Sequence, residues 1–229
     1  MLSTKDLGKE ANSTPKTLEP GNRSAKINKI TVEDFPFRAN AKHIILHLEG
    51  PDLGSEFQGF YIDKDNPDAG RHAGQVAKVK ASDFAFSDST TKTGIVIERD
   101  REMLRFIKNI CTALGKEAVD WFESIDGVYG TVEDLIDAFN QTGLFKDVFF
   151  DFCIAGKKYM NKAGYETFDM YLPKFTKTTV PFELTDSSPS KLISFNPSVH
   201  ITELKPKAVA SFQAEGGAPP VSAKGDFDL

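Results

Sequence analysis

The hydrophobic periodicity of the chain changes twice, and this constrains the fold more than any other feature. Between residues 41 and 49 apolar side chains alternate with polar ones, which is the pattern of a half-buried strand. From Asp100 to Leu114 apolar residues recur every three or four positions, as on one face of a helix. Strand patterns return at Asp147. The chain is therefore expected to build strands, then a helical block, then strands again.

The same patterns give bounds for each element. We expect strands at 25–32, 41–49, 57–63, 147–154, 165–172 and 192–204, a short strand or helix near 76–86, and helices at 100–114, 118–125 and 131–143. The pair 147–154 and 165–172 predicts a hairpin around the turn 161–164, with a longer loop including 157–160 as the alternative.

This order predicts an α+β fold that is mainly antiparallel. An OB-fold is a five-stranded barrel, and a helix commonly follows its third strand, so the prediction is an OB-like barrel with a helical insertion between strands three and four. The helical block of about 45 residues is longer than a single OB helix, and other α+β folds have the same order of elements.

Length and composition predict one folded domain with two tails. The chain has 229 residues, of which 40% are hydrophobic and 11% aromatic, enough for a real core. We expect an N-terminal arm at 1–23, an OB-like domain at 24–206 with the helical block at about 98–142, and a linker with an acidic tip at 207–229.

Charge and cysteine content narrow the classes of function. A net charge of −5 gives no overall attraction to DNA or membranes, although it leaves room for a local basic groove. The N-terminus has no apolar leader pattern, so a soluble, cytoplasmic protein is expected. Cys111 and Cys153 lie in apolar contexts without metal-ligand spacing and are expected to be buried free thiols.

The predicted hairpin carries the best candidate for a binding surface. Residues 155–180 contain five lysines against two acids, interleaved with aromatic residues. Exposed rings stack on unpaired bases while lysines neutralise phosphates, so this pattern predicts nucleic-acid binding, although basic hairpins are also common for solubility alone. The candidate nucleic-acid-binding residues, including two from the expected third strand, are Lys157, Lys158, Tyr159, Lys162, Tyr165, Tyr171, Lys174, Phe60 and Tyr61.

The alternation of side chains along the predicted strand 165–172 indicates which of them face the solvent. Phe168, Met170 and Leu172 fall on the expected core side, which leaves Tyr165 and Tyr171 pointing outward. The helical block holds ten acids and five bases, so a DNA groove is expected to face away from it. Arg71 and Lys80 extend the groove in this prediction.

Enzyme signatures are absent from the pattern. The segment 70–74 lacks the Lys-Ser/Thr end of a phosphate-binding loop. His43 and His47 are four apart on a strand, about 13 Å, too far to share one metal ion. We therefore expect no catalytic residues, no metal and no cofactor.

The C-terminus has a composition of its own. Residues 216–225 are rich in Gly, Ala, Pro and Ser, which predicts a flexible tether. It ends in Asp226, Phe227, Asp228 and Leu229, where two apolar side chains stand among three negative charges, a pattern suited to a basic-rimmed pocket. A frayed terminus with a chance Phe and Leu has the same composition.

This tip resembles the C-terminal tip of bacterial and phage single-stranded DNA-binding proteins. The resemblance covers the tail, the acidic pI and the overall plan, and the tip is shorter and less acidic than most. It implies a protein that coats unpaired DNA during replication or recombination, with Asp226, Phe227, Asp228 and Leu229 binding partner proteins. A bacteriophage origin would place it in the host cytoplasm.

Two other classes remain open at this point. A structural or assembly protein of a virion would use the tail to dock a partner, and its basic hairpin would be ordinary surface. A nuclease or recombination accessory would assemble a metal centre from acids such as Asp147, Asp151 and Asp169. Neither the oligomeric state nor a preference for DNA over RNA follows from the sequence.

Overall fold

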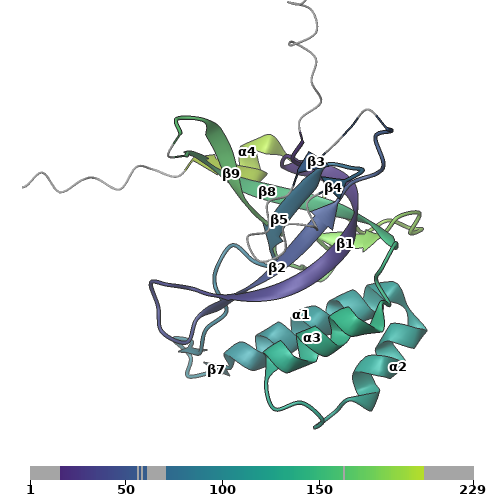
Figure 1. The fold of residues 1–229 in the computed structure, drawn as a ribbon. Helices are drawn as coiled ribbons and strands as arrows, with labels where there is room; N and C mark the ends of the chain where they lie inside the picture. Colours follow the sequence, from purple (N-terminus) through teal and green to yellow (C-terminus); the bar gives the residue numbers. More distant parts are fainter. Residues whose placement is uncertain (1–15, 56, 58, 61–70, 162, 204–229) are drawn as a thin grey trace, which may run out of the picture.

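The computed structural model describes residues 16–55, 57, 59–60, 71–161 and 163–203. Within these residues the fold is mixed α/β, with a mostly antiparallel seven-stranded sheet and four helices. Figure 1 shows the three longer helices gathered on one side of the strands. The predicted α+β class and its helical block are confirmed at this level.

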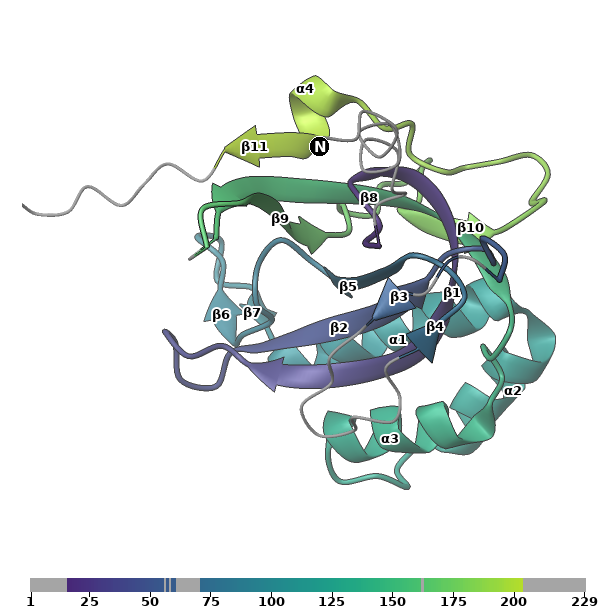
Figure 2. The ribbon, with the colours of Figure 1, turned by 45° about the horizontal axis from the view of Figure 1, so that its top comes forward.

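The sheet is built around two long strands. Strand β1 (Gly21–Asp34) pairs through its first half with β8 (Phe149–Met160) and through its second half with β2 (Lys42–Glu49). The register of β1 against β2 shifts between Ile27 and Lys29, a bulge-type irregularity that bends a strand. Figure 2 shows β1 running from beside β8 to beside β2. One strand therefore joins the two halves of the sheet.

The pairings return to their starting strand. β2 pairs with β5 (Val76–Lys80), and β5 pairs in parallel with β9 (Glu166–Tyr171) through Lys80 and Tyr171. β9 then pairs with β8, which pairs with β1. Two further strands pair with β8 outside this circuit, β10 (Phe182–Leu184) and β11 (Ile201–Glu203).

The helical layer follows the predicted periodicity. Helix α1 (Arg99–Leu114) is followed by α2 (Lys116–Ser124) and α3 (Val132–Thr142). The buried stripe of α1 comprises Met103, Phe106, Ile107, Ile110 and Cys111.

The ends of α3 are set by local chemistry. The Thr131 Oγ1 accepts a hydrogen bond from the Asp134 amide at 3.1 Å, as an N-cap does. Gly143 ends the helix in the left-handed region at φ 70°, where glycine has no steric penalty. Both signals were readable in the sequence.

The core lies between the helices and the inward side of the strands. Phe139 of α3 and Phe150 and Phe152 of β8 are among its largest fully buried side chains. Asn140 fixes α3 to β1 because its side chain accepts from the Ile30 amide at 2.9 Å and donates to the Ile30 carbonyl at 2.8 Å. The helical layer and the strands therefore pack as one body.

The third strand of the main sheet was predicted in the wrong place. The expected strand at 57–63 is described only as β3 (Gly59–Phe60), which pairs with β4 (Arg71–His72) outside the main sheet. The position beside β2 belongs to β5, where Ala77 and Val79 enter the core and Lys78 and Lys80 alternate with them. Five residues with two lysines give a weak strand signal, and pairing on both sides of β5 outweighs it.

The C-terminal part also differs from the expectation. The segment 192–204 forms α4 (Pro197–His200) and β11 rather than one strand, because Asn196 caps a helix that starts at Pro197. β10 was not predicted. A small ladder of β6 (Ser89–Thr90) and β7 (Val96–Ile97) precedes α1.

The packed chain begins before residue 24. Leu18 is buried and its amide donates to the Val76 carbonyl at 3.0 Å, and β1 is already paired at Gly21. The first part of the expected arm, 1–15, and the expected linker and tip from 207 lie outside the described residues.

Candidate nucleic-acid interface

The predicted β8–β9 hairpin is present, and its first strand is longer than the sequence pattern predicted. β8 continues through Met160, so Lys157 to Met160 are strand residues and not loop. The turn is closed by Asn161, whose Oδ1 accepts from the Ala163 and Tyr165 amides at 2.9 Å each. This holds Tyr165 at the tip of the hairpin, with 71% of its surface exposed.

The pairing register decides which hairpin side chains share a face. Lys157 stands opposite Asp169 and Tyr159 opposite Thr167, and Tyr171 lies two residues from Asp169 on the same side. Met170 and Leu172 pack against the core on the other side, as the alternation predicted. The parallel pairing of Tyr171 with Lys80 extends the outward side onto β5.

We call this outward surface the lysine–aromatic face. Its side chains come from β5, β8, β9 and the segments that follow β5 and β9. They are Lys78, Lys80, Phe84, Lys157, Tyr159, Tyr171 and Lys174.

Phe84 is the focus of this face. Its ring is 65% exposed, and the Nζ atoms of Lys157 and Lys174 each lie 5.7 Å from the ring centroid. Lys157 Nζ also lies 5.7 Å from the Tyr171 centroid. Ammonium groups at this distance are attracted to the ring faces. The arrangement thus holds two cations beside one exposed aromatic surface.

Two lysines close to the centre of the face are paired with carboxylates. Lys80 Nζ lies 2.7 Å from Asp169 Oδ2, and Lys157 forms an ion pair with Asp83. Such partly exposed pairs contribute about 0–1 kcal/mol each, so an incoming anion can displace the carboxylate at low cost.

A buried histidine underlies the face. His43 of β2 is 8% exposed, and the Phe35 ring meets it edge-on at a centroid distance of 5.4 Å. Burial lowers the pKa of His43, and the charge of Lys80 lowers it further. At neutral pH the imidazole therefore carries no charge that would add to the face.

The predicted site residues separate into three groups. Lys157, Tyr171 and Lys174 meet around Phe84, and Tyr159 shares the strand side of Lys157. Lys158 points to the other side of β8, where its Nζ lies 2.7 Å from Glu166 Oε2.

The third group consists of Phe60, which is not part of the main sheet, and of residues that lie outside the described part of the chain. Phe60 belongs to β3, which lies outside the main sheet. Lys162, Tyr61 and the four tip residues Asp226, Phe227, Asp228 and Leu229 lie outside the described residues.

Sequence reasoning missed Phe84 and Lys78 and named Lys80 only as an extension. Phe84 lies in a segment without strand periodicity, where its amide donates to Ser82 Oγ at 3.3 Å. The alternation of Ala77, Lys78, Val79 and Lys80 was the signal that could have placed both lysines on an outward face.

The cysteines are free and buried. Burial raises the pKa of the Cys111 thiol to about 12 and that of the Cys153 thiol to about 11. Both are held as neutral thiols, the inert form. Within the described part of the chain, no group of three or more His, Cys, Asp or Glu residues is placed to hold a metal ion.

The comparisons add no relative. Protein-family models, curated proteins and solved structures all fail to match this chain. In the portions that the structure describes, no helix has the length and apolar character needed to cross a membrane.

Proposed function

We propose that the chain is a single-stranded DNA-binding protein, which coats unpaired DNA during replication or recombination and recruits partner proteins through its C-terminal tail. In this proposal the lysine–aromatic face contacts the DNA. The observation that carries it is the exposed Phe84 ring between the ammonium groups of Lys157 and Lys174.

The chemistry of that arrangement favours single strands. Unpaired bases expose their faces and stack on aromatic rings, at roughly 1–3 kcal/mol per base, whereas the bases of a duplex are already stacked on one another. In the proposed complex the ammonium groups of Lys157 and Lys174, which lie over the ring in the free protein, move to the phosphates on either side of the stacked base. Phe84 is the proposed stacking platform, and Tyr171 and Tyr159 continue it along the strands.

The strand circuit supports an OB-like barrel as the scaffold. The five strands β1, β2, β5, β8 and β9 pair in a closed sequence, β5 and β9 run parallel, and the helices lie between the third and fourth of these strands. OB-folds bind oligonucleotides on the face of strands two and three and on the loops after strands one and four. In this chain those loops are 35–41, which carries Phe37 at 81% exposure, and 161–165.

The ion pairs of the face fit a binding site that is shielded when empty. Asp83 and Asp169 form ion pairs with Lys157 and Lys80. A phosphate replaces each carboxylate contact, so binding exchanges one ion pair for another and remains sensitive to salt. The overall negative charge then limits non-specific attraction to duplex DNA.

Titration of the full chain with a fluorescein-labelled oligo-dT tests the proposal. Anisotropy should rise saturably at 50 mM NaCl, and the affinity should fall as salt increases. Phe84→Ala should weaken binding by about 5- to 100-fold, since it removes one stacked base. Tyr129→Ala, on the helical layer, is the matched control and should change the affinity less than twofold.

Two results would contradict this function. One is the absence of saturable binding at low salt, and the other is an affinity that Phe84→Ala and Tyr129→Ala reduce equally. A defined large assembly of the DNA-free chain in size-exclusion chromatography would favour a structural or assembly protein. For the tail, deletion of residues 226–229 should leave DNA binding intact or stronger and abolish contacts with a replication polymerase or helicase.

A further inference from the structure

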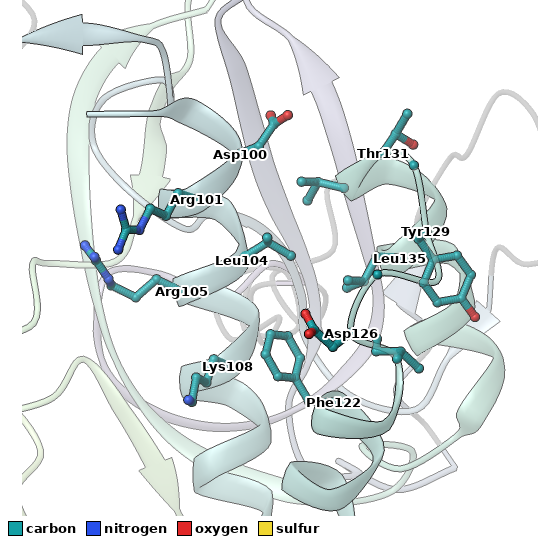
Figure 3. Close-up of a pocket in the computed structure, with 14 residues that line it drawn as sticks. Asp100, Arg101, Leu104, Arg105, Lys108, Phe122, Asp126, Tyr129, Thr131 and Leu135 are labelled. Atoms are coloured by element: carbon teal, nitrogen blue, oxygen red, sulfur yellow. The ribbon is translucent and has the colours of Figure 1, made fainter. Parts of the chain in front are cut away.

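A second candidate surface lies on the helical layer, away from the lysine–aromatic face. A cavity of about 400 Å³ opens between α1, the end of α2 and the start of α3. Figure 3 shows Leu104 of α1, Phe122 of α2 and Leu135 of α3 converging on it from three directions. Its volume lies within the range of pockets that bind small ligands or a few side chains. We call it the helical pocket.

One rim of the helical pocket is basic. Arg101, Arg105 and Lys108 are exposed, line the cavity and are spaced four and three residues apart, so they form a stripe along α1. In Figure 3 the Arg101 and Arg105 side chains extend to the side of α1 that faces away from Leu135. Arg105 pairs with Glu102 of the same helix. Among the residues that the structure describes, Arg101 and Lys108 form no ion pair, so two unpaired cations lie at the outer edge of the cavity.

The concentration of these cations is unusual for the helical block. Four of its five basic residues lie in α1, while its ten acids are spread over all three helices and their connections. The block as a whole repels anions, yet this one rim attracts them. A basic edge next to an apolar cavity, on a helical block that is otherwise acidic, suits an acidic segment with bulky apolar side chains.

We propose that the helical pocket binds the C-terminal tip of the same chain, Asp226 to Leu229. Phe227 and Leu229 fill the apolar floor, and Asp226 and Asp228 meet Arg101 and Lys108. The tip has the two chemical properties that the pocket requires, apolar bulk and negative charge, side by side in four residues.

The acids that line the pocket fit the same orientation. The Asp100 carboxylate is occupied, because Arg99 Nε lies 2.6 Å from its Oδ1. Asp126 lies nearer the apolar side chains. The tail supplies a cation for it in Lys224, which precedes Asp226 by two residues. The tip therefore enters with its acids toward α1 and Lys224 toward Asp126.

The tail is long enough to reach the pocket. The 22 residues from 204 to 225 can span at most roughly 75 Å when extended. A folded domain of this size has a radius of gyration of roughly 16 Å, so the tip can reach any point on its surface. Because the tip is tethered, its effective concentration at the pocket is of millimolar order, and weak contacts suffice to hold it.

Docking in the helical pocket has a consequence for recruitment. A tip that is bound to its own helical layer is withheld from partner proteins, while the lysine–aromatic face stays open. A partner must then compete with the pocket for the tip. This inference does not depend on DNA binding, because the pocket and the strand face share none of their residues.

A paramagnetic label on the tail of the full chain tests the proposal. Cys111 and Cys153 are buried and inert, so a nitroxide reagent reacts selectively with a cysteine introduced by Ser222→Cys. In ¹⁵N-labelled protein without DNA, the label should broaden the amides of α1 near Arg101 to Lys108 and those of 126–130. The amides of β5, β8 and β9 should keep their intensity.

Matched variants separate docking from proximity. Arg101→Glu with Lys108→Glu should restore at least half of the lost amide intensity, and Phe227→Ala should do the same. Lys92→Glu with Lys146→Glu reverses two exposed lysines elsewhere and should leave the broadening unchanged. Because all four positions are exposed, circular dichroism should confirm that every variant keeps its fold.

Three outcomes would overturn the proposal. Uniformly weak broadening over the whole domain means that the tip has no site, and broadening centred on β5 and β9 means that it lies on the lysine–aromatic face. The same broadening in unlabelled ¹⁵N protein that is mixed with spin-labelled ¹⁴N protein means that the occupant is a second copy. Oligo-dT binding measured on the same sample reports separately on the proposed function.

Discussion

The lysine–aromatic face and the basic rim of α1 both place cations beside apolar or aromatic surface, but they are constructed differently. On the strand face two lysines meet carboxylates from distant parts of the chain: Lys157 meets Asp83, and Lys80 meets Asp169 across 89 residues of sequence. Among the described residues, the α1 stripe has one ion pair, and it is local, between Arg105 and Glu102 three residues away.

Within the described residues, the fold therefore neutralises some cations with carboxylates and leaves others without an ion-pair partner. Strand pairing brings distant residues into register, so it can set an acid beside a base with no sequence signal. A helix brings only its own neighbours together. On the strand face an incoming anion must displace the carboxylates that pair with Lys80 and Lys157. At the α1 rim, Arg101 and Lys108 have no carboxylate to displace in the part of the chain that the structure describes.

The largest expected effect comes from reversing the strand-face cations. Lys80→Glu with Lys157→Glu should lower oligo-dT affinity on the order of 100-fold at 50 mM NaCl, because two phosphate contacts are lost and two repulsions are added. Arg101→Glu with Lys108→Glu should change it less than twofold. Fluorescence anisotropy measures both, and equal losses would erase the distinction between the two surfaces.

A second test compares a buried carboxylate with a half-buried one at the surface of α1. Glu49, at the end of β2, is buried and accepts hydrogen bonds from Asn28 Nδ2 at 2.8 Å and from the Ala73 amide at 3.2 Å. Burial alone would raise its pKa, but the Asn28 hydrogen bond and the nearby Lys26 outweigh burial and lower the pKa.

Neutralising these two carboxylates should have unequal effects on stability. Glu49→Gln should reduce the free energy of unfolding by about 1–3 kcal/mol, since buried donors lose their charged acceptor. Glu102→Gln, on the surface of α1, should cost no more than about 0.5 kcal/mol. Urea denaturation compares them, and a similar small effect at both sites would show that the Glu49 contacts contribute little.

A third test removes a shielding acid. Asp83→Asn takes the carboxylate away from Lys157 without changing its volume, so oligo-dT affinity should rise by about two- to fivefold. Asp120→Asn, which removes the partner of Lys116 on α2, is the matched control and should have no effect. If Asp83→Asn weakens binding, Asp83 positions Lys157 for DNA and does not compete with it.

Some features of the fold and the site were predictable from the sequence, and others were not. The α1 stripe, the Thr131 cap and the β8–β9 hairpin were predictable, because each depends on neighbours within a few residues. The place of β5 was not, since it depends on pairing with β2 and β9. Phe84 was missed for the same reason. Its two lysines come from β8 and from the segment after β9, at least 73 residues away.

The smallest expected effect is a pH dependence of the folding stability, caused by His43 of β2. The folded pKa of His43 is lowered, so between that pKa and the unfolded value of about 6.5 the unfolded chain binds a proton more readily. Stability from this residue is complete above about pH 6.5 and falls as the pH drops through that window.

The groups facing His43 set the size of this effect. They are Lys80, which opposes protonation, and Asp169, Glu33 and Asp83, which favour it. Thermal melts from pH 7.5 to 5 should show a decline in Tm that His43→Phe reduces. A decline that is identical in the wild-type and variant proteins would assign the acid sensitivity to other groups.

The most direct test of the central claim is amide chemical-shift mapping of the full chain during titration with oligo-dT. The largest changes should fall on residues 78–86, 157–159 and 169–174, which carry the lysine–aromatic face, while α1 to α3 remain unperturbed. Changes concentrated on the helical layer, or no saturable change at 50 mM NaCl, would contradict the assignment of DNA binding to the strand face.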